Sequence, residues 1–414
     1  MANFELRIET SEFKKVLDVL STVVNRKNAL PILSCARFSY DPAARVFTSL
    51  AGNSEQYLAV ECTKVDDGER RPWMFFDGKG ELEPFCVNVE TFREAFACLP
   101  AYPAVCTLTE QGASLLLKVN YGKGEFTLPV ERALDYPVVP EVVEKGVTLR
   151  EGVNAVCKFQ LKSALLLPLL SAARSCAAND PLRPQMNTVC LDVWQDKLIV
   201  VASDGHTMYR NQLDLGSPWL DYGEFAADAS ERLLLPVQSI GAILKAFGTA
   251  EVITVVADSQ RVRLQSADGI TLTSAQQEGR YPNYDSVIPK NQPHRVLLDR
   301  QEVQMTLRRL SVFSAEASNM AVLRQVGDKL ELHASDEEFS RSAGEQVAIV
   351  NGEAVDLGTQ FRLGFKISHM QQMLAICQTE QVYLEMRDAQ TALLVKEDSA
   401  KSSLTLLVMP MLIN

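Results

Sequence analysis

The chain repeats one arrangement of apolar and polar positions six times. Each repeat starts with a short alternating run, continues with apolar residues at helical spacing, and ends in further alternating runs separated by turn residues. The predicted helical segments are 13–24, 92–99, 165–173, 240–247, 303–313 and 367–376. Turns such as Tyr121-Gly-Lys-Gly124 and Ala267-Asp-Gly269 favour antiparallel hairpins between the alternating runs. The pattern therefore predicts an α+β protein built from six strand-helix-strands units.

A second repeat groups these units in pairs. Leu134-Asp-Tyr-Pro137 follows the first pair of units, and Gly279-Arg-Tyr-Pro282 follows the second pair at a similar offset. Prolines gather at the same two places, as is typical where a chain leaves one domain for the next. We therefore expect three similar domains of two units each, at 1–140, 141–290 and 291–414.

Composition narrows the class of protein. A chain of 414 residues with 47% hydrophobic and 22% charged residues is typical of a globular protein with several domains. No apolar run approaches the roughly 18 residues of a membrane span. The N-terminal residues do not form a secretory signal, so we expect a cytoplasmic protein.

The nine cysteines argue against metal or disulfide chemistry because no two form a Cys-x-x-Cys pair. Cys106, Cys190 and Cys377 lie in apolar runs, where we expect small buried side chains. We expect neither a metal nor a cofactor.

The net charge of −11 taken alone argues against a nucleic-acid partner. The six helical segments with their flanks nevertheless carry an excess of basic residues, while the rest of the chain is acidic. If the helices share one surface, that surface is mildly basic and the sheet surface repels polyanions. The basic residues concerned are Lys14, Lys15, Arg26, Lys27, Lys162, Arg174, Lys245, Arg308, Arg309 and Lys366.

Four motifs carry a resemblance to a known family. They are Ala29-Leu-Pro-Ile-Leu33, Ala202-Ser-Asp-Gly-His206, Gly279-Arg-Tyr-Pro-Asn-Tyr284 with Val287-Ile-Pro-Lys-Asn291, and Leu407-Val-Met-Pro-Met411. In this order, over essentially the whole chain, they closely resemble the bacterial sliding clamp, the beta subunit of DNA polymerase III.

This resemblance implies the DNA clamp fold, with three similar domains per chain and two chains joined head to tail into a closed ring. Helices would line the hole and antiparallel sheets would form the outer wall. Twelve helices spaced about 9 to 10 Å apart leave a hole of about 25 to 30 Å, which admits a duplex about 20 Å across.

The implied function is that of a non-catalytic processivity factor for DNA replication. The ring would encircle double-stranded DNA without reading its sequence, through weak phosphate contacts. It would tether the replicative DNA polymerase, the clamp loader and other replication and repair proteins. Arg93 joins the DNA-facing residues, although the nearby Glu90 occupies a place that is commonly basic in the family.

The family also implies a partner-peptide pocket between the second and third domains, which takes short segments with a Gln and apolar anchors. Thr207, Ser286 and Leu412 depart from the family pattern and make the pocket rim less basic, so we expect a preference for peptides with few acidic residues. The matching positions are Met186, Ser203, Gly205, His206, Thr207, Met208, Pro282, Val287, Ile367, Leu407, Val408, Met409, Pro410 and Met411.

Two other classes of protein stay open. Asp204 and His206 near Ser203 could form an acid–base or nucleophile set, although Asp-Gly is also a common turn dipeptide. A β-rich adaptor that binds no DNA would explain the repeat equally well. The segment 66–83 is expected to form a longer hairpin or loop than the family requires.

Overall fold

The computed structural model describes residues 5–24, 30–44, 46–63, 76–79, 83–111, 114–147, 152–216, 219–223, 229–326, 329–350, 357 and 361–413. Arg26, Lys27 and most of the segment 66–83 lie outside these residues. The chain forms two compact units. The first comprises residues 1–168, 218–224 and 238–276, and the second comprises residues 169–217, 225–237 and 277–414.

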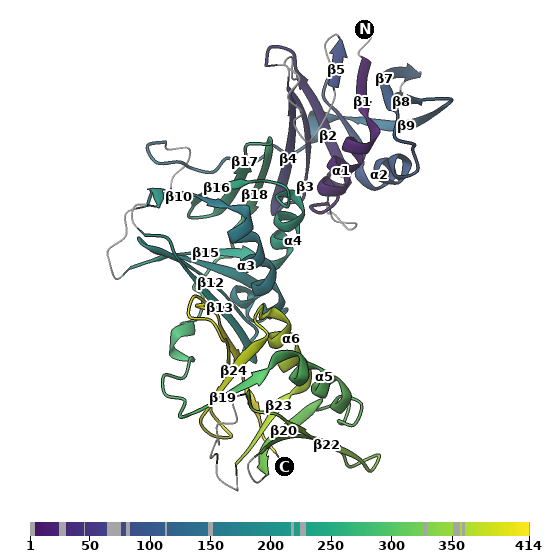
Figure 1. Cartoon of the computed structure of the whole chain (residues 1–414). Coiled ribbons are helices and arrows are strands. Elements are labelled where there is room, and N and C mark those ends of the chain that lie inside the picture. Colours follow the sequence, from purple (N-terminus) through teal and green to yellow (C-terminus); the bar gives the residue numbers. More distant parts are fainter. Residues whose placement is uncertain are drawn as a thin grey trace. The chain divides into compact units, whose positions relative to one another are not determined.

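The described residues form six α-helices, at the places that the apolar spacing predicts (Figure 1). Asn88 precedes one helix and accepts a hydrogen bond from the Thr91 N–H at 3.0 Å. Asp299 precedes another and accepts from the Glu302 N–H at 2.7 Å, so both residues satisfy N–H groups that a helix leaves unpaired. The helices are α1 (Thr10–Leu20), α2 (Val89–Ala97), α3 (Ser163–Cys176), α4 (Val237–Ala246), α5 (Arg300–Leu310) and α6 (Ile367–Ile376).

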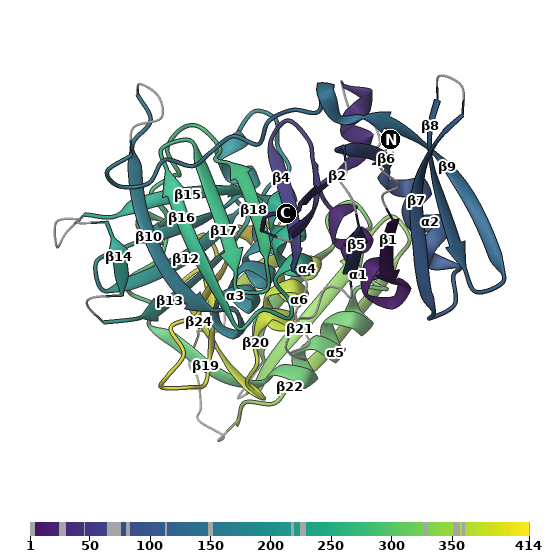
Figure 2. The ribbon, with the colours of Figure 1, turned by 90° about the horizontal axis from the view of Figure 1, so that it is seen from above.

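The first unit is built on one 14-stranded antiparallel sheet, and Figure 2 shows β16, β17 and β18 side by side within it. The short strand β5 comes from the segment 66–83 and pairs with β1 at one edge. The strands in spatial order are β14 (Leu220–Tyr222), β10 (Ala155–Lys162), β16 (Val252–Asp258), β17 (Arg261–Ser266), β18 (Ile270–Ala275), β4 (Gln56–Thr63), β3 (Val46–Gly52), β2 (Cys35–Asp41), β6 (Phe85–Asn88), β9 (Gly124–Arg132), β8 (Ser114–Tyr121), β7 (Pro103–Gln111), β1 (Glu5–Glu9) and β5 (Phe76–Lys79).

This sheet is continuous because β18 pairs with β4, which lies far away in the sequence. Ile270 pairs with Val60 in this ladder, and both side chains are buried. The Glu61 N–H donates to the carbonyl oxygen of Gly269 at 2.8 Å. Gly269 has a φ of +86°, and a Cβ atom there would lie 2.5 Å from the Glu61 carbonyl oxygen, so the pairing requires glycine.

Aromatic rings hold α1 and α2 on this sheet, where the two helices pack side by side (Figure 1). The ring centroids of Phe13 and Phe96 are 5.1 Å apart, and those of Phe92 and Phe96 are 4.9 Å apart. Phe38 on β2 meets Phe92 edge to face at 5.7 Å. Each fully buried ring of this kind stabilises the fold by about 2 to 3 kcal/mol.

The second unit contains two antiparallel sheets, with α5 and α6 packed against each other and α5 against β22. The eight-stranded sheet runs β15 (Glu231–Pro236), β11 (Thr188–Val193), β12 (Lys197–Ser203), β13 (Thr207–Asp214), β26 (Thr405–Val408), β25 (Leu393–Glu397), β24 (Gln381–Met386) and β19 (His294–Asp299). The five-stranded sheet runs β22 (Arg341–Val347), β21 (Lys329–Asp336), β20 (Met320–Val326), β23 (Arg362–Lys366) and β27 (Pro410–Met411). The predicted α+β class with antiparallel sheets is confirmed.

The cysteines are all unbonded thiols, and Cys106, Cys190 and Cys377 are buried as predicted. Within the described ranges, no group of three or more His, Cys, Asp or Glu residues is placed to hold a metal ion. No helix of the described chain is long and apolar enough to cross a membrane.

Candidate functional site

The Asp-Gly-His and Met-Pro-Met motifs meet in the second unit, where β13 pairs with β26. Thr207 lies opposite Val408, and Met208 lies opposite Leu407. Just beyond this ladder, the Met409 N–H donates to the His206 carbonyl oxygen at 2.8 Å. The chain then enters β27, which pairs with β23 of the five-stranded sheet. Two motifs far apart in the sequence therefore form one continuous site.

The turn between β12 and β13 is held by its own side chains. One carboxylate oxygen of Asp204, Oδ1, accepts hydrogen bonds from the N–H groups of His206 and Thr207 at 2.8 and 2.6 Å and from Thr207 Oγ1 at 3.1 Å. Ser203 Oγ donates to the Thr207 carbonyl oxygen at 2.7 Å, and Gly205 takes a φ of +90°. The polar atoms that an acid–base set would use therefore shape the turn, and the turn presents the exposed His206 side chain.

The predicted pocket residues separate into an exposed layer and a buried layer. Val287 is 56% exposed and Met409 is 39% exposed, so both present large apolar side chains to solvent. Met208 and Leu407 are buried and belong to the apolar cluster that contains Tyr281 and Tyr284. The exposed members are Gly205, His206, Pro282, Val287 and Met409; the half-buried members are Met186, Ser203, Pro410 and Met411; and the buried members are Thr207, Met208, Ile367, Leu407 and Val408.

A second histidine, which sequence reasoning missed, lies beside His206. The ring centroids of His206 and His369 on α6 are 5.9 Å apart in a stacked arrangement. Burial lowers the pKa of His369, and Lys366 and His206 lower it further while Asp204 raises it. His369 was hidden in the sequence because only the packing of α6 brings it to the motif.

The end of α3 reaches the same site. Gln372 Nε2 on α6 donates to the Ser175 carbonyl oxygen at 2.5 Å and reaches Cys176 Sγ at 3.8 Å. Burial raises the pKa of the Cys176 thiol to about 12, so this side chain is protonated at neutral pH. The pair of hydrogen bonds fixes α6 against α3.

The charges around the site are largely compensated. Arg210 on β13 lies 3.5 Å from the carboxylate of Asp285, and Arg183 lies 2.8 Å from that of Asp180. Ser286 donates to the Asn283 carbonyl oxygen at 2.7 Å and brings no charge. Each of these two arginines therefore faces a carboxylate, and the weakly basic rim stays a prediction.

A buried polar group under one wall of the site was also missed. Asp192 on β11 is fully buried and accepts hydrogen bonds from Tyr284 Oη at 2.5 Å and from Arg232 Nε at 3.2 Å. Burial and the Asp192 carboxylate together raise the pKa of the Tyr284 hydroxyl. Tyr281 and Tyr284 pack in an apolar cluster with Met208 and Leu407. An acidic residue inside an apolar strand was the one signal in the sequence.

Apart from Arg26 and Lys27, which lie outside the described residues, the predicted DNA-facing residues lie on helices or at their ends in both units. Three of them are already paired: Lys15 with Glu12 at 2.9 Å, Arg93 with Asp18 at 3.4 Å, and Arg309 with Glu345 at 2.6 Å. Lys14 Nζ donates to the Leu99 carbonyl oxygen at 2.7 Å. Lys366 is half-buried. Four of the predicted DNA-facing residues are exposed and make no ion pair within the described chain: Lys162, Arg174, Lys245 and Arg308.

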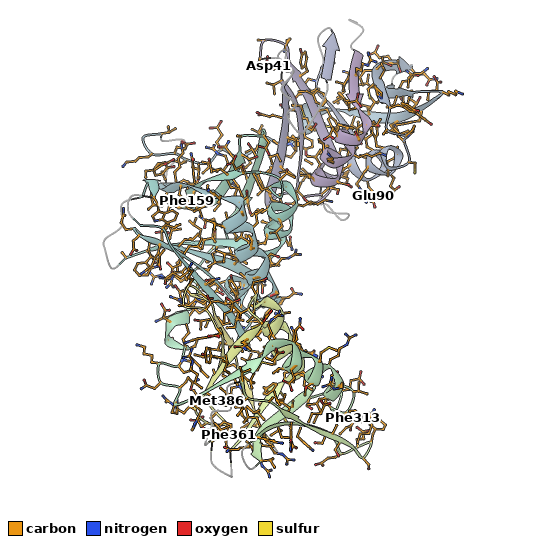
Figure 3. The ribbon with its side chains drawn as sticks, in the orientation of Figure 1. Asp41, Glu90, Phe159, Phe313, Phe361 and Met386 are labelled. Atoms are coloured by element: carbon orange, nitrogen blue, oxygen red, sulfur yellow. The ribbon has the colours of Figure 1, made fainter. Side chains whose placement is uncertain are left out.

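A surface cavity of about 390 Å³ lies between the end of α1 and the start of α2. Glu90 and Arg93 both line it, and Figure 3 labels Glu90 at this place. The acidic Glu90 beside the paired Arg93 makes this part of the first unit less basic than the sequence alone suggests.

Comparison with solved structures defines the fold. The chain superposes on the crystal structure of the DNA polymerase sliding clamp from Bacillus subtilis with a TM-score of 0.82, at 18% identity and complete coverage of both chains. The sliding clamp from Pseudomonas aeruginosa gives a TM-score of 0.81 at 21% identity, over 99% of this chain and 100% of that one. The fold is that of the sliding clamps.

Sequence comparison finds similarity to one family. Residues 285–412 match the family described as DNA polymerase III beta subunit, C-terminal domain. The beta sliding clamp of Pseudomonas putida is 25% identical over 405 residues, 98% of each chain. That of Vibrio cholerae is 22% identical over 396 residues, 95% of this chain and 96% of its own. The resemblance predicted from the motifs is confirmed: the chain is similar to beta sliding clamps over nearly its whole length, and residues 285–412 match the C-terminal domain of the DNA polymerase III beta subunit.

Proposed function

We propose that two copies of this chain close into a ring that encircles duplex DNA and tethers the replicative polymerase for processive synthesis. The observation that carries the proposal is the similarity to beta sliding clamps along the whole chain, in both sequence and fold. The ring holds DNA by enclosing it, so the chain needs neither a catalytic group nor a cofactor, and it acts in the cytoplasm. The three domains 1–140, 141–290 and 291–414 supply the helices that face the DNA.

Two unpaired strand edges support head-to-tail closure. Within the described residues, β22 pairs only with β21, and β9 pairs with β6 only at Glu131 and Arg132, so the outer side of 124–130 is open. Val312 and Phe313, which follow α5, are 63% and 37% exposed. Figure 3 labels Phe313. In the ring, the open edge of β9 in the first domain of one copy would pair with β22 in the third domain of the other copy. This pairing would extend the sheet and cover these apolar side chains, and it would occur at both contacts between the two copies.

The exposed apolar surface around His206 and Met409 is proposed to bind partner peptides. Val287, Met409 and the half-buried Met411 offer adaptable apolar contacts, and Pro410 has no N–H to satisfy. The replicative polymerase, the clamp loader and repair proteins would use the same surface in turn. Because Arg210 and Arg183 already face carboxylates, the surface favours a peptide whose anchors are apolar and uncharged.

Retention on DNA tests the ring. The protein is loaded on nicked circular DNA by a bacterial clamp loader, and the bound fraction is measured before and after the circle is cut. The proposal expects retention on circles and loss from linear ends. Equal retention on both forms, or none despite an active loader, would leave the chain as an adaptor whose basic helices are incidental.

The state of association tests closure. Phe313→Asp places a charge in the proposed contact and is expected to convert a dimer to a monomer in analytical ultracentrifugation. Leu182→Asp is the matched control, because Leu182 is 89% exposed in the same unit and outside the proposed contact. A dimer that survives Phe313→Asp would place the contact elsewhere.

A further inference from the structure

We propose that Asp192 and Arg232 are positioning residues for partner binding, because they fix the segment 281–287 that forms one wall of the peptide site. This inference rests on the proposed peptide site described above. Neither residue is among the predicted pocket residues; both act through Tyr281 and Tyr284.

The contacts form a small network around the buried Asp192 in the second unit. Asp192 on β11 and Arg232 on β15 lie opposite each other in the strand ladder, and Arg232 Nε donates to the Asp192 carboxylate at 3.2 Å. Tyr284 Oη donates to the same carboxylate oxygen, Oδ2, at 2.5 Å. Arg232 Nη1 donates to the Tyr281 carbonyl oxygen at 3.3 Å, and its guanidinium lies 5.2 Å from the Tyr284 ring centroid. One ion pair therefore holds the segment at two points.

The network matters because the backbone of the segment holds it only weakly. No residue of 281–287 lies in a strand. The backbone hydrogen bonds within the segment, from Ser286 to Asn283 and from Val287 to Tyr284, are both 3.4 Å long. Two side-chain contacts add to them: Ser286 Oγ donates to the Asn283 carbonyl oxygen at 2.7 Å, and Arg210 lies 3.5 Å from the Asp285 carboxylate. Its orientation is set by the packing of the two buried tyrosines, which are 4% and 3% exposed, and by the contacts of the Tyr284 hydroxyl with Asp192 and of the Tyr281 carbonyl oxygen with Arg232.

The position of this segment decides the shape of the site. Pro282 and Val287 belong to the segment and are exposed, while Tyr281 and Tyr284 pack in the same cluster as Met208 and Leu407 beneath the two motifs. A shift of the tyrosines would therefore move Pro282 and Val287 relative to Met409. A full hydrogen bond to a buried charged group resists such a shift more strongly than apolar packing does.

The test uses the full-length protein and a fluorescein-labelled pentapeptide that has an N-terminal Gln and leucine and phenylalanine anchors. Tyr284→Phe removes only the hydroxyl, Asp192→Asn removes the charge, and Arg232→Lys keeps the charge but cannot span both acceptors. Fluorescence anisotropy gives Kd, hydrogen exchange reports the amides of 281–287, and thermal unfolding reports stability. Asp258→Asn is the matched control: Asp258 is also fully buried and accepts from the N–H groups of Val143, Gln260 and Arg261, in the first unit.

We expect Tyr284→Phe to raise Kd about fivefold to tenfold and Asp192→Asn to raise it further, each with faster exchange in 281–287. Asp258→Asn should lower the unfolding temperature but leave Kd within about twofold of the wild type. If all three network variants bind the peptide with a Kd within twofold of the wild type, the inference is overturned and the peptide site still stands. The same holds if Asp258→Asn loses as much affinity as the network variants do. Failure of the wild-type protein to bind the peptide would instead overturn the peptide site itself, and the inference with it.

Discussion

The junction between β18 and β4 allows a sharp test of the fold, through Gly269. Alanine at this position takes on two costs. A φ of +86° disfavours any residue with a Cβ by about 1 to 2 kcal/mol. The new Cβ would also lie 2.5 Å from the Glu61 carbonyl oxygen, which is backbone and cannot swing away.

The second cost can be isolated within the same unit. Gly146 has a φ of +85°, and a Cβ atom there would meet nothing within 4 Å, so Gly146→Ala carries only the conformational cost. Relief of the clash at 269 requires β4 and β18 to separate slightly, which weakens the 2.8 Å hydrogen bond from Glu61 to Gly269. Overpacking of about 1 to 3 kcal/mol and a lost hydrogen bond of about 1 kcal/mol give a difference of about 2 to 4 kcal/mol between the two variants.

Urea unfolding of the wild type and both variants measures this difference, and hydrogen exchange at the Glu61 amide locates it. Gly269→Ala should unfold at lower urea than Gly146→Ala and lose protection at Glu61, while Gly146→Ala keeps it. If the two variants lie within about 0.5 kcal/mol of each other, the close approach at this junction does not constrain the sequence as we infer.

Three further outcomes are expected. Lys245→Ala or Arg308→Ala should reduce the slope of log DNA affinity against log salt concentration by up to about 1. Arg309→Ala should change this slope less, because Glu345 already pairs with Arg309. Equal effects of the three substitutions would contradict this ranking. Met409→Ala should raise the Kd of a neutral apolar peptide about tenfold without changing the urea midpoint, and an unchanged Kd would argue against the peptide site. Because burial lowers the pKa of His369, the folded unit binds a proton less readily than the unfolded chain, so stability should fall as the pH drops below about 6.5. Urea midpoints between about pH 7.5 and 5 should fall less steeply in His369→Gln, and identical slopes would refute the assignment.

The sequence was sufficient for the helices and hairpins because their signals are local. Apolar spacing placed all six helices, and turn residues such as Ala267-Asp-Gly269 placed the hairpins. The two junctions, β18 with β4 and β13 with β26, pair residues that are distant along the chain, and no periodicity reports such pairings. They join the strands of successive predicted domains into continuous sheets.

For the candidate site, the sequence predicted only the residues that belong to its motifs. The resemblance brought His206 and Met409 to one place, and the structure joins them by a hydrogen bond. It could not separate exposed Val287 from buried Ile367, because both are apolar residues near motifs. The ion pair between Lys15 and Glu12 could be predicted, because the two residues are three positions apart on one helix. The partners of Arg93 and Arg309 lie on other elements, so the sequence did not indicate these pairs.

The β18–β4 ladder also affects synthesis of the chain on the ribosome. β4 emerges early, but its partner strand begins at Ile270, roughly 210 residues after Val60. At about 5 to 20 residues per second, the nascent chain carries an unpaired β4 edge for about 10 to 40 s. Leu58 and Val60, which are buried in the finished protein, are uncovered during this interval. Translation speed over the middle of the message therefore sets how long the emerging N-terminal part is open to mispairing or needs a chaperone.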